Sequence, residues 1–280
     1  MAPHSLAVFG ITGRMGQSLI RALREGTQFK LQGAIASAGS PRLGLDAAAE
    51  GEATGVMITA DPGAALEHAS VAVDFSLAGA VAAHARACAE ASVPLLVGAT
   101  GFDAPAKAEL TRAARSIAVL IAPNTSVGVA VLNQLAAAAT RALGASYEVD
   151  IAEAHHRLKR DAPSGTALSL GEAIARARAV ALSDVAVYEG LGPDAPRAGS
   201  DAPHVRSDAP RKAGSIGFSV VRAGDIVGEH TVTFTGSGER LEFTHRATDR
   251  LTFARGALRG AAWLIGRPPG LYAMNDVLGI

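Results

Sequence analysis

The sequence predicts an α/β protein with a Rossmann-like, doubly wound parallel sheet domain and a second α+β domain with a mixed, largely antiparallel sheet. Short apolar strands alternate with helices between residues 5 and 125. Strands that are apolar throughout are typical of a parallel sheet covered on both faces. From Val149 onward, strands are joined by short turns instead, which predicts an antiparallel meander.

The first half of the chain repeats one unit of strand and helix. Leu6–Phe9 is apolar and ends at a glycine-rich turn, and Met15–Arg24 has helical spacing of apolar residues. The same alternation continues to residue 121. The expected strands are 6–9, 31–36, 71–75, 94–97 and 118–121, and the expected helices are 15–24, 78–89 and 104–116.

The second half changes character. Asp150–Ala154 alternates polar and apolar residues like a half-buried strand, and helical spacing begins at Ala167. Three Asp-Ala-Pro repeats occur in a polar stretch at about 190–213, which we interpret as a long surface loop. The expected later strands are 216–221, 226–235 and 241–246, and a final helix is expected at 251–266.

The composition narrows the possible functions. The chain has 280 residues, of which 49% are hydrophobic, enough for a core. Its 26 basic and 26 acidic residues cancel, so we expect neither nucleic acid nor an anionic membrane as a partner. We expect Cys88 to be a buried structural thiol, because one cysteine forms no internal disulfide. No signal peptide and no apolar stretch of about 20 residues stand out, so a cytoplasmic location is expected.

Three glycines follow the first expected strand directly. Gly10, Gly13 and Gly16 open the first helix, a spacing that differs from the strict G-x-G-x-x-G pattern. Glycines at this spacing can play the same part as those of the strict pattern, because glycine permits a tight turn and lets a pyrophosphate approach the backbone. A plain glycine turn is the competing interpretation. The position after the first strand of an alternating array favours a dinucleotide site.

The stretch EAHHRLKRDAPSGTA, residues 153–167, carries most of the polar chemistry. His155, His156 and Lys159 lie on a connection between a strand and a helix. Ser164 is placed to cap that helix, which leaves first-turn amides free to bind an anion. Adjacent histidines beside a lysine, without a third ligand at suitable spacing, make a poor metal site, so no metal is expected. Nor does the chain contain the G-x-S-x-G elbow of a serine hydrolase.

Five sequence blocks together resemble the 4-hydroxy-tetrahydrodipicolinate reductase (dihydrodipicolinate reductase) family, in that family's order and across almost the whole chain. The blocks are residues 10–16, 97–102, 122–128, 153–167 and 221–230. The resemblance implies NADPH or NADH as cofactor, a small cyclic imine with two carboxylates as substrate, and a homotetramer built through the meander sheets. It also implies a dinucleotide-binding domain at 1–126, with a C-terminal segment at 241–280 packing back on it, and a substrate-binding and oligomerisation domain at 127–240.

Residue roles carried over from the resemblance fall into three groups. The proton donors are His155 and Lys159. The substrate-binding residues are His156, Gly165 and Thr166, with Arg240 as a further basic residue near the substrate. The cofactor-binding residues are Gly10, Ile11, Thr12, Gly13, Arg14, Met15, Gly98, Ala99, Thr100, Ala122, Pro123, Asn124 and Thr125. The chain departs from the family at Ala99 and Thr125. We interpret the remaining histidines, His230 and His84 included, as structural or surface residues.

The sequence leaves open which coenzyme is preferred and whether another function shares the glycine loop at residues 10–16. No Asp or Glu follows the second expected strand, which runs into Ala36 and Ser37, so no carboxylate repels a 2′-phosphate. Because Arg14 and Arg42 could attract that phosphate, we expect NADPH to be accepted at least as well as NADH. Another two-domain NAD(P)-dependent dehydrogenase, or a non-catalytic nucleotide-sensing protein, would share the glycine loop. Neither needs the 153–167 stretch.

Overall fold

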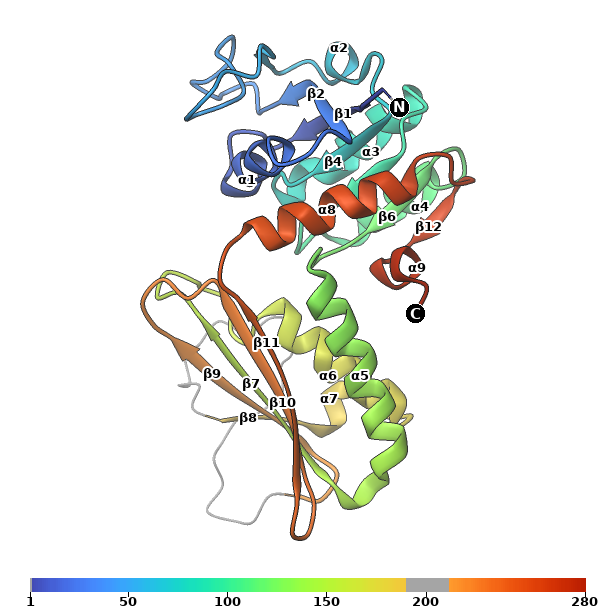
Figure 1. Cartoon of the computed structure of the whole chain (residues 1–280). Helices are drawn as coiled ribbons and strands as arrows, with labels where there is room; N and C mark the ends of the chain where they lie inside the picture. The colour runs from blue at the N-terminus through green and yellow to red at the C-terminus, as the bar shows by residue number, and fades with distance from the viewer. Residues whose placement is uncertain (1, 190–211) are drawn as a thin grey trace. The chain divides into compact units, whose positions relative to one another are not determined.

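The computed structural model describes residues 2–189 and 212–280 (Figure 1). The expected loop at 190–213 therefore lies almost entirely outside the described residues. The chain divides into two compact units, Met1–Val127 with Arg250–Ile280, and Gly128–Asp249. We expected the second domain to end at residue 240. The second unit continues to Asp249 instead, because residue 240 begins one of its strands, Arg240–Ala247.

The first unit contains a seven-stranded sheet in which every pairing is parallel, in the order β12-β6-β5-β4-β1-β2-β3. The predicted parallel sheet is thus confirmed. Strands β4 and β5 are buried along their whole length, which explains their continuous apolar sequence. The strands are β1 His4–Phe9, β2 Phe29–Ile35, β3 Ile58–Thr59, β4 Val71–Asp74, β5 Leu95–Val97, β6 Ala118–Ile121 and β12 Gly270–Tyr272.

Helices cover both faces of this sheet. Successive strand residues point to opposite faces, so neighbouring residues of one strand contact different helices. Leu95 and Val97 pack in one cluster with α3 and α4, whereas Leu96 lies against Gly260 of α8. Helix α8, which is orange-red in Figure 1, contacts the blue helix α1 and the strands β4, β5 and β6. The helices are α1 Arg14–Leu23, α2 Pro62–Leu66, η1 Ala78–Ala80, α3 Val81–Glu90, α4 Ala104–Ala113, α8 Leu251–Leu264 and α9 Met274–Leu278.

The second unit contains a five-stranded mixed sheet in the order β11-β10-β7-β9-β8. The predicted meander is wrong in one respect, because β7 lies between β9 and β10: it pairs parallel to β9 and antiparallel to β10. The strands are β7 Glu148–His155, β8 Ala186–Glu189, β9 Ile216–Arg222, β10 Gly228–Thr235 and β11 Arg240–Ala247. The helices are α5 Val127–Leu143, η2 Gly144–Ser146, α6 Gly165–Ala177 and α7 Leu182–Val185.

The expectation that no apolar stretch reaches about 20 residues is wrong for α5. Together with η2 it forms a 20-residue stretch, Val127–Ser146, with a mean hydropathy of 1.2, long and apolar enough by those two measures to cross a membrane. A core helix of a globular domain passes the same test. Here Leu132 and Ala136 pack into the core of the second unit with Val149 and Ile151. This packing accounts for the buried side of the helix, which is about a third of the stretch (33%).

Candidate active site

The glycine loop of the first unit has no room for larger side chains. Gly10 has a φ of 74°, and a Cβ atom there would lie 2.7 Å from the carbonyl oxygen of Phe75. A Cβ atom on Gly16 would lie 2.4 Å from the carbonyl oxygen of Ile11. Backbone therefore packs directly on backbone where the first strand meets its helix. A tight turn and close packing of helix on strand are the roles that the first and last glycines have in dinucleotide-binding folds.

Helix α1 begins at Arg14 without a capping side chain. Gly13 occupies the N-cap position, and the first turn contains no acidic residue. Its first amides are therefore available to an anion at the positive end of the helix dipole. The exposed Arg14 side chain stands at the same end, with no hydrogen bond or ion pair to any described residue. Helix start and arginine together fit a dinucleotide phosphate.

The other predicted cofactor loops end neighbouring strands of the same sheet. Residues 98–100 follow β5 and residues 122–125 follow β6, so they lie at the same carboxyl edge as residues 10–15. Thr125 is almost fully buried, and its hydroxyl donates to the Phe253 carbonyl of α8 over 2.7 Å. This hydrogen bond holds α8 against the loop after β6. Ala99 is also buried, whereas Thr100 is exposed.

The structure gives Arg42 a different task from the one expected. Its guanidinium donates to the backbone carbonyls of Asp46 and Ala48 over 2.8 and 2.9 Å. The Asp46 carboxylate in turn accepts from the amides of Ala48, Thr54 and Gly55. Arg42 thus stabilises the conformation of the loop after β2. Of the two arginines considered for a 2′-phosphate, only Arg14 remains uncommitted among the described residues.

In the second unit, the buried face of the sheet changes from apolar to polar along β7. Val149 and Ile151 belong to the core, while Glu153 and His155, further along the same face, are also buried. On β10 the corresponding sequence is Phe234, Val232 and then His230. The polar end of this face contains the predicted proton donor His155, so the core of the unit supports the site directly.

Glu153 is the central buried charge of this site. Its carboxylate accepts from His155 Nδ1 over 2.5 Å, from two Arg222 nitrogens over 2.8 Å each, and from the Ser164 amide over 2.9 Å. Burial alone would raise the pKa of Glu153, but the hydrogen bonds from His155 and Arg222 outweigh it and lower the pKa to about 2. Glu153 is therefore a carboxylate at neutral pH, and His155 keeps only Nε2 for other partners.

Arg222 holds the 156–164 connection in place. Besides Glu153, it donates to the carbonyl of Asp161 over 2.7 Å. The β9–β10 turn adds two backbone hydrogen bonds, from Ala223 to the His155 carbonyl and from Arg157 to the Gly224 carbonyl. The connection that carries Lys159 is therefore tied to β9 and its turn.

The interpretation of His230 as a sheet-surface residue is wrong. It is 3% exposed, its ring centroid lies 5.2 Å from that of His155, and its Nε2 lies 3.1 Å from the Ser164 hydroxyl. Burial and the neighbouring His155 lower the pKa of His230 to about 3, so its ring is neutral. Its Nδ1 is buried with no hydrogen-bond partner among the described residues. Alternation along β10 put His230 on one face but could not say that this face was inward.

The remaining predicted substrate residues surround the start of α6. Ser164 caps the helix by accepting from the Ala167 amide over 3.2 Å, as predicted, and Gly165 is exposed at the first helical position. Lys159 is held by Asp161 over 2.8 Å, with about a fifth of its side chain exposed. The Lys159 amide donates to the His156 carbonyl, which closes the turn between these two residues.

The structure does not bring Arg240 to this site. It pairs with Thr235, which pairs in turn with Glu148, seven residues before His155 on β7. At about 3.3 Å per strand residue, Arg240 lies roughly 23 Å along the sheet from His155. It forms an ion pair with Glu242 there. The basic residue that the structure places beside His155 is Arg222, which lies in the block 221–230 but had no predicted role.

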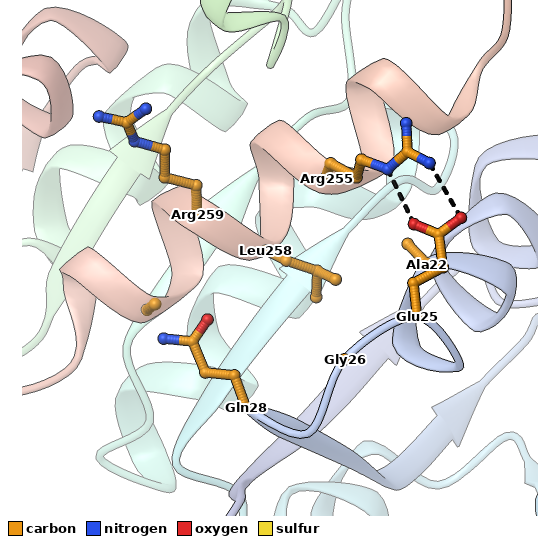
Figure 2. Close-up of a pocket in the computed structure, with 8 residues that line it drawn as sticks. Ala22, Glu25, Gly26, Gln28, Arg255, Leu258 and Arg259 are labelled. Atoms are coloured by element: carbon orange, nitrogen blue, oxygen red, sulfur yellow. Dashed lines mark hydrogen bonds and ion pairs between the residues drawn. The ribbon is translucent and has the colours of Figure 1, made fainter.

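A shallow pocket occurs elsewhere in the first unit. It has a volume of about 320 Å³ and lies between the end of α1 and α8, where Arg255 and Glu25 form a bidentate ion pair (Figure 2). Gln28 lines it and accepts from the amide of His4 at the amino end of β1. The pocket is therefore at the opposite end of the sheet from the glycine loop. Among the described residues, no group of three or more His, Cys, Asp or Glu side chains could hold a metal ion.

Comparison with known families decides the identity of this two-unit arrangement. Residues 4–125 match the family model described as dihydrodipicolinate reductase, N-terminus, and residues 128–278 match dihydrodipicolinate reductase, C-terminus. The chain belongs to the dihydrodipicolinate reductase family. It is therefore an NAD(P)H-dependent oxidoreductase, as the resemblance of its five sequence blocks implied.

Full-length relatives support this membership of the reductase family. The chain is 47% identical to 4-hydroxy-tetrahydrodipicolinate reductase of Anaeromyxobacter dehalogenans strain 2CP-1, over 98% of this chain and 97% of the relative. It is also 47% identical to the enzyme of that name from Thiobacillus denitrificans, over 98% of both chains. The reductase fold resembles dipicolinate-bound dihydrodipicolinate reductase from Paenisporosarcina sp. TG-14, with a TM-score of 0.72, 20% identity and 98% coverage of both chains.

Proposed function

We propose that this reductase converts 4-hydroxy-tetrahydrodipicolinate to tetrahydrodipicolinate in the diaminopimelate and lysine pathway, with the cofactor on the first unit and the proton donors His155 and Lys159 on the second. Membership of the family supports the reaction. The observation that carries the residue roles is the Glu153 carboxylate, which occupies His155 Nδ1 and leaves Nε2 for the substrate.

The proposed cofactor residues are the three loops at the carboxyl edge of the parallel sheet, residues 10–15, 98–100 and 122–125. When bound there, NADH or NADPH supplies the hydride. The close packing at Gly10 and Gly16 supports the pyrophosphate position, and the uncapped start of α1 supplies amides for it.

The proposed substrate contacts use the start of α6. The Gly165 and Thr166 amides, with His156 and Lys159, would hold a carboxylate of the cyclic imine. The 4-hydroxyl group leaves as water, which creates a carbon–carbon double bond conjugated with the imine. Addition of hydride to this double bond drives negative charge toward the ring nitrogen. His155 and Lys159 supply the proton that neutralises this charge, acting as general acids.

An assay that supplies 4-hydroxy-tetrahydrodipicolinate and either coenzyme, and follows coenzyme oxidation, tests this proposal. His155→Ala and Lys159→Ala should fold normally and lose about 10²- to 10⁴-fold in kcat, the usual cost of losing a general acid. Rates within a few-fold of the unchanged protein in both variants would refute the assignment of proton donors. A chain that binds dinucleotide but reduces no substrate would support the nucleotide-sensing alternative.

We propose that NADPH is used at least as well as NADH. The exposed Arg14 at the start of α1 supports this, and no carboxylate follows β2, where Ala36 and Ser37 stand. Arg14→Ala should lower kcat/KM for NADPH more than for NADH. A tenfold or greater preference of the unchanged protein for NADH would contradict the proposal.

We also propose a cytoplasmic homotetramer assembled through the second unit. One face of its sheet carries Ser219, Val221 and the threonines of β10, and the helices α5 and α6 pack against the other face. Val221 is 53% exposed on that open face. Because a large uncovered sheet face is typical of an interface, light scattering should give four times the mass of one chain. A monomer at micromolar concentration would contradict this.

A further inference from the structure

A buried carboxylate and a histidine lie directly beneath the proposed cofactor loops, and neither has a role in the proposed function. Asp74, the last residue of β4, has no exposed surface. Its Oδ2 atom lies 2.8 Å from Nδ1 of His84 on α3, and its Oδ1 atom accepts from the Ser76 amide over 2.8 Å. A buried charge of this kind is tolerated only when it is paired and hydrogen-bonded.

Asp74 and the residue after it, Phe75, together connect three loops of the carboxyl edge. The backbone carbonyl of Asp74 accepts from the amides of Gly98 and Ala99 over 2.9 and 3.1 Å. The carbonyl of the next residue, Phe75, packs against Gly10, and its ring packs against Gly98, where a Cβ atom would come within 2.2 Å of it. The turn after β4 therefore lies between the glycine loop and the 98–100 loop, touching both.

His84 supports this turn from below. Its ring stacks on Phe9, the last residue of β1, with centroids 4.1 Å apart and planes 20° apart. Its Nδ1 also lies 3.2 Å from the Ser76 hydroxyl. Through Phe9, Asp74 and Ser76, His84 contacts the end of β1 and the turn after β4. The ring is mostly covered, with 15% of the side chain exposed.

We propose that the Asp74–His84 pair is a positioning unit for the dinucleotide: it holds the turn 75–77 in the shape that closes the cofactor site between the glycine loop and the 98–100 loop. The inference rests on the proposed location of the cofactor. The pair touches neither the cofactor nor the substrate and takes no part in proton transfer. Its loss should therefore weaken cofactor binding while leaving the chemical step in the saturated enzyme unchanged.

The test compares His84→Phe with His84→Asn by measuring the dissociation constants of NADPH and NADH through quenching of protein fluorescence. Phenylalanine keeps the stack on Phe9 but cannot donate to Asp74, so Kd should rise about tenfold for both coenzymes. Asparagine places its amide where Nδ1 stood, so Kd should return to within about threefold. At saturating cofactor, kcat and the KM for substrate should stay within about twofold in both variants.

The matched control is His4→Phe, at the amino end of β1 and beside another aromatic ring, Phe29. It should leave Kd unchanged. A folded His84→Phe protein with unaltered Kd, or one that loses kcat instead, would overturn the proposal. If the unchanged protein binds no dinucleotide, the proposed function itself fails, which distinguishes the two outcomes.

A second measurement needs no variant. Amide hydrogen exchange of the unchanged protein, with and without NADPH, should show added protection in residues 74–84 together with the glycine loop. Protection of the glycine loop without any change in 74–84 would overturn the positioning role even if His84→Phe does not fold.

Discussion

One carboxylate sets the geometry of the proposed proton-donor site. Glu153 accepts from His155, Arg222 and the Ser164 amide, so three segments far apart in sequence meet at a single side chain. Such a buried anion is costly unless every oxygen is satisfied, and here both oxygens are. Glu153 and Arg222 are therefore positioning residues for His155.

The first prediction concerns Glu153→Gln. Removing the charge frees the orientation and tautomer of His155, so kcat should fall about 10- to 100-fold while the Kd for cofactor is unchanged. Steady-state kinetics across pH 5.5 to 9 is the measurement, because the pH dependence of kcat should shift with the lost anion. Glu148→Gln, at the exposed start of the same strand, is the matched control. Equal kcat in both variants would refute the positioning role.

The second prediction uses the depressed pKa of His230. Because the folded protein holds this ring neutral down to a pKa of about 3, the unfolded chain binds one proton more once the pH falls below about 6.5. Stability is full above pH 6.5 and should fall by about 1.4 kcal/mol per pH unit below it. Glu153, whose lowered pKa is about 2, adds to the loss only below about pH 4.5, and His245 acts in the same direction as His230.

Urea denaturation at pH 7.5, 6.5, 5.5 and 4.5 measures this slope. His230→Gln, which keeps an amide near the Nε2 position, should flatten the slope between pH 6.5 and 4.5. A slope that is the same in both proteins would assign the effect to other groups.

At the scale of elements, one close contact decides where α8 sits. Gly256 of α8 lies against the carbonyl of Thr125, where a Cβ atom would come within 1.8 Å, and the Thr125 hydroxyl donates to Phe253 on the same helix. The two contacts seat the helix on the loop after β6. Helix and loop are 128 residues apart along the chain.

The third prediction is therefore that Gly256→Ala destabilises the first unit by about 1–3 kcal/mol, the usual cost of overpacking. Thermal denaturation should show a lower Tm. Gly79→Ala is the matched control, because a Cβ atom there would meet nothing within 4 Å. An equal Tm in both variants would show that α8 can shift without cost.

The elements that the sequence predicted correctly are those defined by local pattern. The apolar strands β1, β4, β5 and β6 and the cap at Ser164 follow from residues close together in the chain. The errors concern long-range pairing. Nothing local to β7 says that it lies between β9 and β10, and Arg240, whose role was carried over from the resemblance, lies at the other end of its sheet. Arg222 and Glu153 were overlooked because their function depends on that same pairing.

At the scale of the whole molecule, the chain crosses between its two units twice, at residues 127/128 and 249/250. The proposed cofactor loops are in one unit and the proposed proton donors in the other. Hydride transfer requires reacting atoms about 3–3.5 Å apart. Turnover therefore requires the cofactor of one unit and the proton donors of the other to reach the same substrate molecule.

The fourth prediction is that the two crossing points act as hinges and that the units close on binding. Small-angle X-ray scattering should show a smaller radius of gyration with NADPH and a dicarboxylate inhibitor than without ligands. NADPH alone serves as the control. Identical profiles in all three states would contradict closure.

The return of the chain to its first unit also orders events during synthesis. Gly260 of α8 covers Leu96 and Leu120, and β12 completes the edge of the parallel sheet beside β6, yet both elements come from the last 31 residues. A ribosome adding about 5–20 residues per second needs roughly 6–24 s to make the 122 residues of 128–249. Throughout that interval the nascent first unit lacks the helix that covers one apolar sheet face and the strand that pairs with β6, so we expect it to be more prone to aggregation than the completed unit.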